Sequence, residues 1–150
     1  MRVVIQKVSR ASVEIEGKIN REIEHGLLIL LGIEDSDTGE DIDWLCGKIS
    51  RLRIFDDENG IMNLSINDVG GEALVVSQFT LHASTKKGNR PSYIKAAKPD
   101  FAIPMYEQFV ERLGQEIQKE VKTGTFGAMM NIKLVNEGPV TIIIDSQNKE

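Results

Sequence analysis

The sequence predicts an α+β fold in which one mainly antiparallel, strongly curved β-sheet is covered by two helices. Strand-like apolar patterns fill the first third of the chain and return near its end. Two longer segments between these regions carry apolar residues at helical spacing. With 150 residues, the chain has the length of one ordinary domain, so residues 1–150 are expected to form a single domain.

Three strands are expected in the first third of the chain. An apolar strand begins at Val3, and the apolar and charged residues that alternate up to Glu16 have the period of a half-buried strand. A turn at Gly17 leads into a second strand over residues 19–23. Residues 26–33 are continuously apolar, which suits a strand that is buried on both faces.

Two helices are expected to cover this sheet. Thr38 and Asp41 suit the cap and acidic first turn of the first helix, and Trp44 and Cys46 beside its stripe are interpreted as packing groups. Pro104 suits the first turn of the second helix. The apolar stripe of the first helix is Ile42, Leu45, Ile49 and Leu52, and that of the second is Met105, Phe109, Leu113, Ile117 and Val121.

The remaining segments are expected to be turns and strands. Residues 57–60 suit a turn, and residues 73–79 suit an apolar strand that leads into a long loop. A Gly-rich loop at 123–127 precedes a β-hairpin whose strands are residues 129–135 and 140–144.

Composition excludes several classes of protein. Cys46 is the only cysteine, which excludes a disulfide framework and a cysteine-based metal cluster and fits a reducing cytoplasm. The N-terminus does not have the pattern of a signal peptide. The longest apolar run, Leu27–Leu31, is too short to span a membrane, so no membrane association is expected.

The net charge of −5 conceals one basic segment. Residues 73–99 contain no Asp or Glu but five basic side chains, namely Lys86, Lys87, Arg90, Lys95 and Lys98. Charge runs are commonly no more than solvated surface. A basic loop on an acidic body also suits contact with a phosphate backbone, and both interpretations remain open.

Familiar catalytic motifs are absent. Neither His25 nor His82 has a ligand partner at the spacing of a zinc site, and no nucleotide-binding glycine motif or nucleophile elbow occurs. Two polar segments remain, Ser77–Leu81 and Asn136–Thr141. Taken alone, the first suits the end of a strand and the second a hairpin turn, although backbone N–H groups at the first segment can also form an oxyanion hole.

Together, the two segments resemble the signature motifs of bacterial-type D-aminoacyl-tRNA deacylases. The motifs are SQFTL at 77–81 and NEGPVT at 136–141. The start MRVVIQKVSRASVEI, the segment GLLILLGI, the loop KKGNRPSY and the segment TGTFGAMM, which contains Phe126, are also similar to that family. The resemblance covers essentially the whole chain.

The resemblance implies a barrel-like homodimer that removes D-amino acids, and glycine from mischarged tRNA, without a cofactor or metal. It places Ser77, Gln78, Phe79 and Thr80 in the catalytic site of one subunit. Gly138 and Pro139, joined by a cis bond, then reach the site of the partner subunit and select the D enantiomer. We further expect substrate or tRNA contacts from Lys86, Lys87, Arg90, Phe126, Asn136 and Thr141.

We expect ester cleavage to depend on backbone N–H groups around Gln78, Phe79 and Thr80, because the Thr80 hydroxyl has no identifiable general base. On this hypothesis Thr80 and Gln78 position substrate or water, and the vicinal ribose hydroxyl assists. Two alternatives remain open at this point. One is a non-catalytic RNA-binding module of the same fold, and the other is a small nucleotide or peptide esterase that needs no tRNA.

Overall fold

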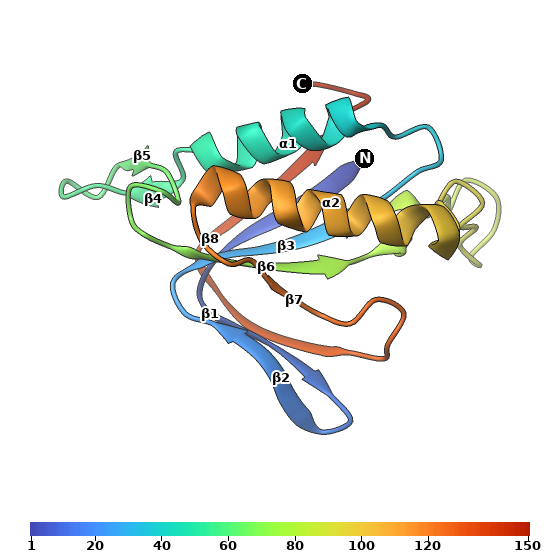
Figure 1. Ribbon diagram of the computed structural model, residues 1–150, viewed down its shortest axis with the longest axis horizontal. Helices are drawn as coiled ribbons and strands as arrows, with labels where there is room; N and C mark the ends of the chain where they lie inside the picture. The colour runs from blue at the N-terminus through green and yellow to red at the C-terminus, as the bar shows by residue number, and fades with distance from the viewer.

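A computed structural model describes residues 1–150. In chain order its elements are β1 Arg2–Ile15, β2 Lys18–Ile23, β3 Gly26–Gly32, α1 Gly39–Arg51, β4 Phe55–Asp56, β5 Met62–Leu64, β6 Glu72–Ser77, the 3-10 helix η1 Phe79–His82, α2 Pro99–Ile117, β7 Lys122–Thr123 and β8 Asn131–Asp145 (Figure 1). The α+β prediction is confirmed. None of the helices combines the length and the apolar character needed to cross a membrane.

The sheet is built around the long strand β1. Residues 2–8 of β1 pair antiparallel with β3, residues 11–15 pair antiparallel with β2, and β8 pairs antiparallel along residues 2–14. Register shifts interrupt these ladders near Val8 and Val13, and such irregularities bend a sheet. The bend brings β2 into contact with β6 and β7, which gives the nearly closed, barrel-like form.

Parallel pairs make the sheet mixed. β3 pairs in parallel with β6, and β6 pairs in parallel with β7. α1 lies between β3 and β6 in the chain, and α2 lies between β6 and β7. Helical crossovers of this kind return the chain to the same end of a sheet, so the strands they join run in parallel. The expected antiparallel pairing holds for every pair that β1 makes.

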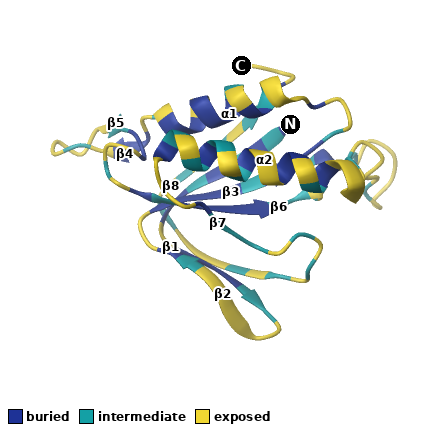
Figure 2. Ribbon diagram, viewed as in Figure 1, coloured by how far each residue is buried: buried dark blue, intermediate teal, exposed yellow.

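Both helices cover the same face of the sheet and lie side by side (Figure 1). Their buried sides face the strands (Figure 2). The cap of α1 is confirmed, because the Asp41 carboxylate accepts a hydrogen bond from the Thr38 N–H at 2.8 Å. The expected start of α2 near Pro104 is wrong: the helix begins at Pro99, which takes the first-turn position, and Pro104 lies inside the helix.

The hydrophobic core has two layers, one on each face of the sheet. Leu27, Ile29 and Leu31 of β3 belong to the larger cluster beneath the helices, whereas Leu28 belongs to a smaller cluster on the other face. This division confirms that β3 is buried on both faces. It also explains why its sequence is continuously apolar, because side chains alternate between the two faces of a strand.

The predicted hairpin near the C-terminus is wrong. Residues 131–145 form one strand, β8, and both of its halves pair with β1. Asn136 pairs with Val8 and Thr141 pairs with Gln6, so residues 137–140 loop out of the strand. β1 is 14 residues long and offers partners to both halves, so the two halves do not turn back on each other.

Candidate active site

The segment Ser77–Leu81 changes from strand to 3-10 helix. β6 ends at Ser77, two residues before the predicted end, because the chain turns into η1 at Phe79. The Gln78 N–H donates to the Leu31 carbonyl at 2.7 Å. That N–H is therefore already bonded, and the expectation that it holds an oxyanion does not apply to Gln78.

Two other backbone N–H groups remain available at this turn. The first hydrogen bond of the turn runs from the Leu81 N–H to the Gln78 carbonyl at 3.2 Å. The N–H groups of Phe79 and Thr80 come before that bond and have no acceptor in the turn. Neither group donates to a side chain of this chain. Two adjacent N–H donors of this kind suit a developing negative charge on an ester oxygen.

The side chains of the segment form a small polar group. The Gln78 Nε2 donates to the Thr80 Oγ1 at 2.5 Å. Ser77, Gln78 and Thr80 are half-buried, whereas Phe79 is exposed. No imidazole, amine or carboxylate forms a hydrogen bond with the Thr80 hydroxyl, so the chain supplies no base that would convert it into a nucleophile.

A cavity of about 80 Å³ lies beside these residues. It is lined by Leu31, Ile33, Ser77, Gln78, Phe79, Ala97, Ala102, Phe126 and Gly127. Phe126 therefore lies next to the Ser77–Thr80 segment, as its predicted role in substrate binding requires. Its lining is mostly apolar, with polar groups from Ser77 and Gln78, a mixture that is common in ligand sites, but its volume is smaller than the roughly 300–1,000 Å³ of most ligand pockets.

Tyr106 of α2 packs against Phe126, one of the residues that line this cavity. Its ring packs edge-on against Phe126 with centroids 5.9 Å apart, and its hydroxyl donates to the Val75 carbonyl at 2.7 Å. Burial raises the pKa of Tyr106 above its usual value, so the hydroxyl stays protonated and keeps donating. Tyr106 thus links Phe126 to β6.

The basic segment forms an exposed loop directly after η1. Lys86, Lys87 and Arg90 are all exposed. Backbone hydrogen bonds of 2.8 and 2.9 Å between Ser84 and Ser92 close the base of the loop. These three cations are therefore accessible to a phosphate backbone.

The second signature segment forms the loop in β8. The Asn136 side chain donates to the Thr141 hydroxyl at 3.0 Å and accepts from the Val140 N–H at 3.1 Å. These two bonds close the base of the loop. The Gly138–Pro139 bond is cis, as the resemblance implies, and both residues are exposed at its tip.

Position 138 admits only glycine without strain. Gly138 has a φ of +122°, and a Cβ atom placed there would lie 2.8 Å from the Val140 Cγ2. L-residues rarely adopt such a backbone conformation. The conformation of this loop therefore requires glycine at position 138.

Within one chain, the two signature segments lie apart. Ser77 aligns with Leu31 and hence with Val3, whereas Asn136 aligns with Val8, and β1 and β3 separate β8 from β6. Strand spacings and rises place the two segments on the order of 20 Å from each other. One chain alone does not bring them together.

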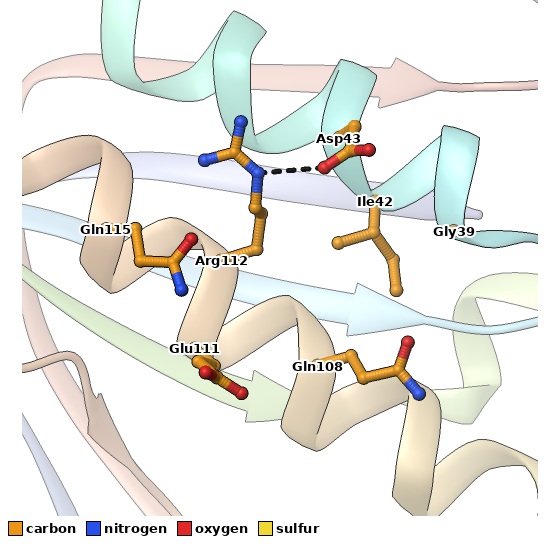
Figure 3. A pocket seen from close by; sticks show the side chains of 7 residues that line it. All are labelled: Gly39, Ile42, Asp43, Gln108, Glu111, Arg112 and Gln115. Carbon is orange, nitrogen blue, oxygen red and sulfur yellow. Dashed lines mark hydrogen bonds and ion pairs between the residues drawn. The ribbon is translucent and has the colours of Figure 1, made fainter.

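A different hollow lies between the helices and contains none of these residues. It has a volume of about 290 Å³ and is lined by Gly39, Ile42, Asp43, Gln108, Glu111, Arg112 and Gln115 (Figure 3). Arg112 bonds to Asp43 at 2.8 Å and to Glu116 at 2.6 Å. The guanidinium is thus paired with two carboxylates, and its ion pair with Asp43 links α2 to α1.

Comparison of the sequence with known proteins identifies the family to which the chain belongs. A family described as D-Tyr-tRNA(Tyr) deacylase matches residues 4–145. The chain belongs to this deacylase family. D-aminoacyl-tRNA deacylases of Flavobacterium johnsoniae and Parabacteroides distasonis are 66% and 67% identical to it, over the full length of both chains.

Solved structures agree with this deacylase fold. A protein named c-Myc DNA Unwinding Element Binding Protein superposes with a TM-score of 0.91 at 38% identity, covering 97% of this chain and 98% of that chain. A probable eukaryotic D-amino acid tRNA deacylase superposes with a TM-score of 0.82 at 17% identity, covering 95% and 97%. The second likeness concerns the fold alone.

The deacylase family makes the chain a hydrolase that deacylates D-aminoacyl-tRNA, which decides against a non-catalytic RNA-binding module. Sequence reasoning missed Ala97 and Ala102, which line the cavity, and Tyr106, which packs against Phe126. Tyr106 lies in the predicted second helix beside its apolar stripe, where a packing role is expected. The alanines have no functional group that would indicate a site. It also missed Tyr93, although that residue stands in the KKGNRPSY loop.

Proposed function

We propose that residues 1–150 act as one domain of a homodimer that hydrolyses D-aminoacyl-tRNA and glycyl esters of mischarged tRNA, and rejects L-aminoacyl-tRNA. The observation that carries the proposal is the pair of unbonded N–H groups at Phe79 and Thr80, beside the cavity. The cytoplasm, where aminoacylated tRNA is used, is the expected location, and no cofactor is expected.

The proposed reaction is addition of water to the ester carbonyl. The carbonyl oxygen becomes an oxyanion, which accepts hydrogen bonds from the Phe79 and Thr80 N–H groups. The bond between the carbonyl carbon and the ribose oxygen then breaks. The proton lost by water goes to the ribose oxygen, so a free amino acid and tRNA leave. Removing one such donor typically costs about 10²–10³ in rate.

Proton transfer is assigned to the substrate rather than to a protein base. Thr80 has no basic neighbour, and its hydroxyl accepts a hydrogen bond from Gln78. The vicinal ribose hydroxyl lies next to the carbonyl in every aminoacyl-tRNA. We therefore assign Gln78 and Thr80 to positioning the ester and the water, and proton relay to the ribose hydroxyl.

Chirality is assigned to the loop of the partner subunit. Gly138 and Pro139 are exposed at the end of a loop clamped by Asn136, and their own chain keeps them away from Ser77–Thr80. A rigid backbone unit that crowds the side where an L side chain projects rejects all L-amino acids alike. Glycine lacks a side chain and passes, whereas D side chains project elsewhere.

The exposed cations Lys86, Lys87 and Arg90 are assigned to the phosphates of the tRNA acceptor end. Phosphate contacts release counterions, so this part of the binding weakens steeply as salt rises. Measuring KM against salt for wild type and for a variant with all three cations replaced by Gln tests the assignment. A salt dependence that is the same in both proteins would count against it.

The test of the proposed function is release of tyrosine from D-Tyr-tRNA by purified, chelator-treated protein. L-Tyr-tRNA is the control substrate, and a glycine-charged tRNA tests the predicted exception. Sedimentation analysis measures the oligomeric state. Release from D-Tyr-tRNA and glycyl-tRNA, little from L-Tyr-tRNA, and a dimer mass are expected, whereas equal release from both enantiomers or a monomer mass contradicts the proposal.

Two further substrates separate this proposal from its rivals. A D-tyrosyl ester on a 2′-deoxy terminal ribose is expected to react slowly, and full activity on it would remove assistance by the ribose hydroxyl. Simple alkyl esters are expected to be poor substrates. Turnover of such esters at the rate of D-Tyr-tRNA would support a general esterase instead.

A further inference from the structure

Two aromatic rings are exposed together beside the proposed ester site. Phe79 is 55% exposed and Tyr93 is 40% exposed. Their ring centroids are 5.1 Å apart, with planes inclined at 75°. The Tyr93 hydroxyl makes no hydrogen bond within the chain. An internal hydrogen bond therefore does not account for this exposed aromatic residue. Adjacent exposed rings commonly mark a binding surface.

The position of Tyr93 is fixed by the backbone around it. The Ser92 N–H donates to the Ser84 carbonyl at 2.9 Å, and the Ala96 N–H donates to the Tyr93 carbonyl at 3.0 Å. The Ala97 N–H donates to the Ile33 carbonyl at 2.9 Å, which joins the end of the loop to the end of β3. The ring is thus held in place beside Phe79 and not carried on a loose tip.

The charge of the chain segment that carries the two rings indicates the chemistry of the ligand. Both rings lie in a stretch, residues 73–99, that contains no acidic residue. The basic residues of that stretch flank Tyr93 on both sides, with Lys86, Lys87 and Arg90 before it and Lys95 and Lys98 after it. Aromatic platforms within basic surroundings are typical of surfaces that bind single-stranded nucleic acid.

We propose that Phe79 and Tyr93 form a stacking platform for the base of the penultimate nucleotide at the single-stranded 3′ end of the tRNA. This inference rests on the proposed function, which places the ester of the terminal nucleoside at the Phe79 N–H. The Phe79 ring contacts Tyr93 of the basic loop. The two rings therefore lie where the RNA strand would leave the ester site. Stacking tolerates any base, because every base has a π face.

Variants of Tyr93 test the platform without altering the N–H donors. Tyr93→Ala removes the ring, Tyr93→Phe retains it, and Ile94→Ala is a matched control, because Ile94 is 87% exposed on the same loop. Three substrates are compared: D-Tyr-tRNA, D-Tyr-tRNA with an abasic penultimate nucleotide, and the D-tyrosyl ester of adenosine alone.

Tyr93→Ala is expected to lower kcat/KM on D-Tyr-tRNA about 5- to 100-fold, mostly through KM, because stacking of one base contributes to binding. The same variant is expected to match wild type on the abasic tRNA and on the adenosine ester. Tyr93→Phe and Ile94→Ala are expected to match wild type on all three substrates.

Three results would overturn the inference. One is an unchanged kcat/KM of Tyr93→Ala on D-Tyr-tRNA. Another is an equal loss on the adenosine ester, which would assign Tyr93 to the ester site itself. The third is a changed sedimentation mass, which would make the rings a subunit contact. Failure of the wild-type enzyme to release D-tyrosine from any of the substrates would instead contradict the proposed function.

Discussion

The amide of Gln78 donates a hydrogen bond to the hydroxyl of Thr80 at 2.5 Å. The hydroxyl oxygen is thereby an acceptor, and no basic side chain stands ready to take its proton. A threonine nucleophile needs such a base. The relationship between these two side chains therefore favours positioning by Thr80 and catalysis by the neighbouring backbone.

Replacement of Thr80 by Ala is expected to lower the single-turnover rate on D-Tyr-tRNA about 5- to 10-fold, the effect of losing one hydrogen bond of about 1 kcal/mol. Thr80→Ser retains the hydroxyl and is the matched control. Rapid-quench measurement of the cleavage step checks this. Complete loss of turnover in Thr80→Ala, together with an ester trapped on Thr80 in the wild type, would assign it the role of nucleophile.

The two hydrogen bonds of Asn136 at the base of the β8 loop predict a stepwise loss of selectivity for the D enantiomer. Asn136→Ala removes both the bond to Thr141 and the bond to the Val140 N–H, whereas Thr141→Val leaves the bond to the Val140 N–H in place and also removes a 3.5 Å bond from the Gln6 amide. The ratio of kcat/KM for D-Tyr-tRNA and L-Tyr-tRNA is expected to fall in both variants, more in Asn136→Ala. Each lost bond is worth about 1 kcal/mol to the ordered loop. Unchanged ratios in both variants would separate this loop from chiral selection.

Alkaline pH is expected to destabilise the fold through Cys46. Burial raises the pKa of this thiol from 9.0 to about 12. Because the folded state holds the proton more tightly than the unfolded state, the contribution is complete below pH 9 and is lost as pH rises toward 12. The slope contributed by one group is at most about 1.4 kcal/mol per pH unit.

Urea unfolding between pH 9 and 11 measures this slope, and Cys46→Ala is the comparison. The variant loses packing at every pH, so only the slope of its unfolding free energy is diagnostic. A shallower slope than that of the wild type is expected. Equal slopes would show that burial of Cys46 does not control its ionisation.

Local patterns predicted the elements whose shape depends on nearby residues. The cap at Thr38, the turn at residues 57–60 and the two-sided burial of β3 follow from spacing within a few residues. The hairpin failed because pairing is not local. The two halves of β8 find their partner in β1, more than 100 residues away in the chain.

The assignment of the site residues stays a prediction, and the structure adds details that the sequence does not contain. The resemblance assigned Ser77–Thr80, Phe126 and the β8 loop to one site, and within one chain the structure places only Phe126 beside Ser77–Thr80. The resemblance could not separate the Gln78 N–H from those of Phe79 and Thr80, because that depends on a bond to Leu31 in another strand. The packing of Phe79 against Tyr93 depends likewise on where the loop returns.

The role of the Phe79 N–H is tested most directly by comparing Phe79→Pro with Phe79→Leu. Phe79 is the first residue of η1, and the first position of a helix is where proline is best tolerated, because its missing N–H has no partner in the helix. Both variants lack the ring, and only Phe79→Pro lacks the donor. Thermal unfolding establishes that both remain folded.

The measurement is the single-turnover rate of release of D-tyrosine from saturating D-Tyr-tRNA. Phe79→Pro is expected to be about 10²–10³-fold slower than Phe79→Leu, the usual effect of losing one oxyanion donor. Equal rates in the two folded variants would contradict catalysis by this backbone group.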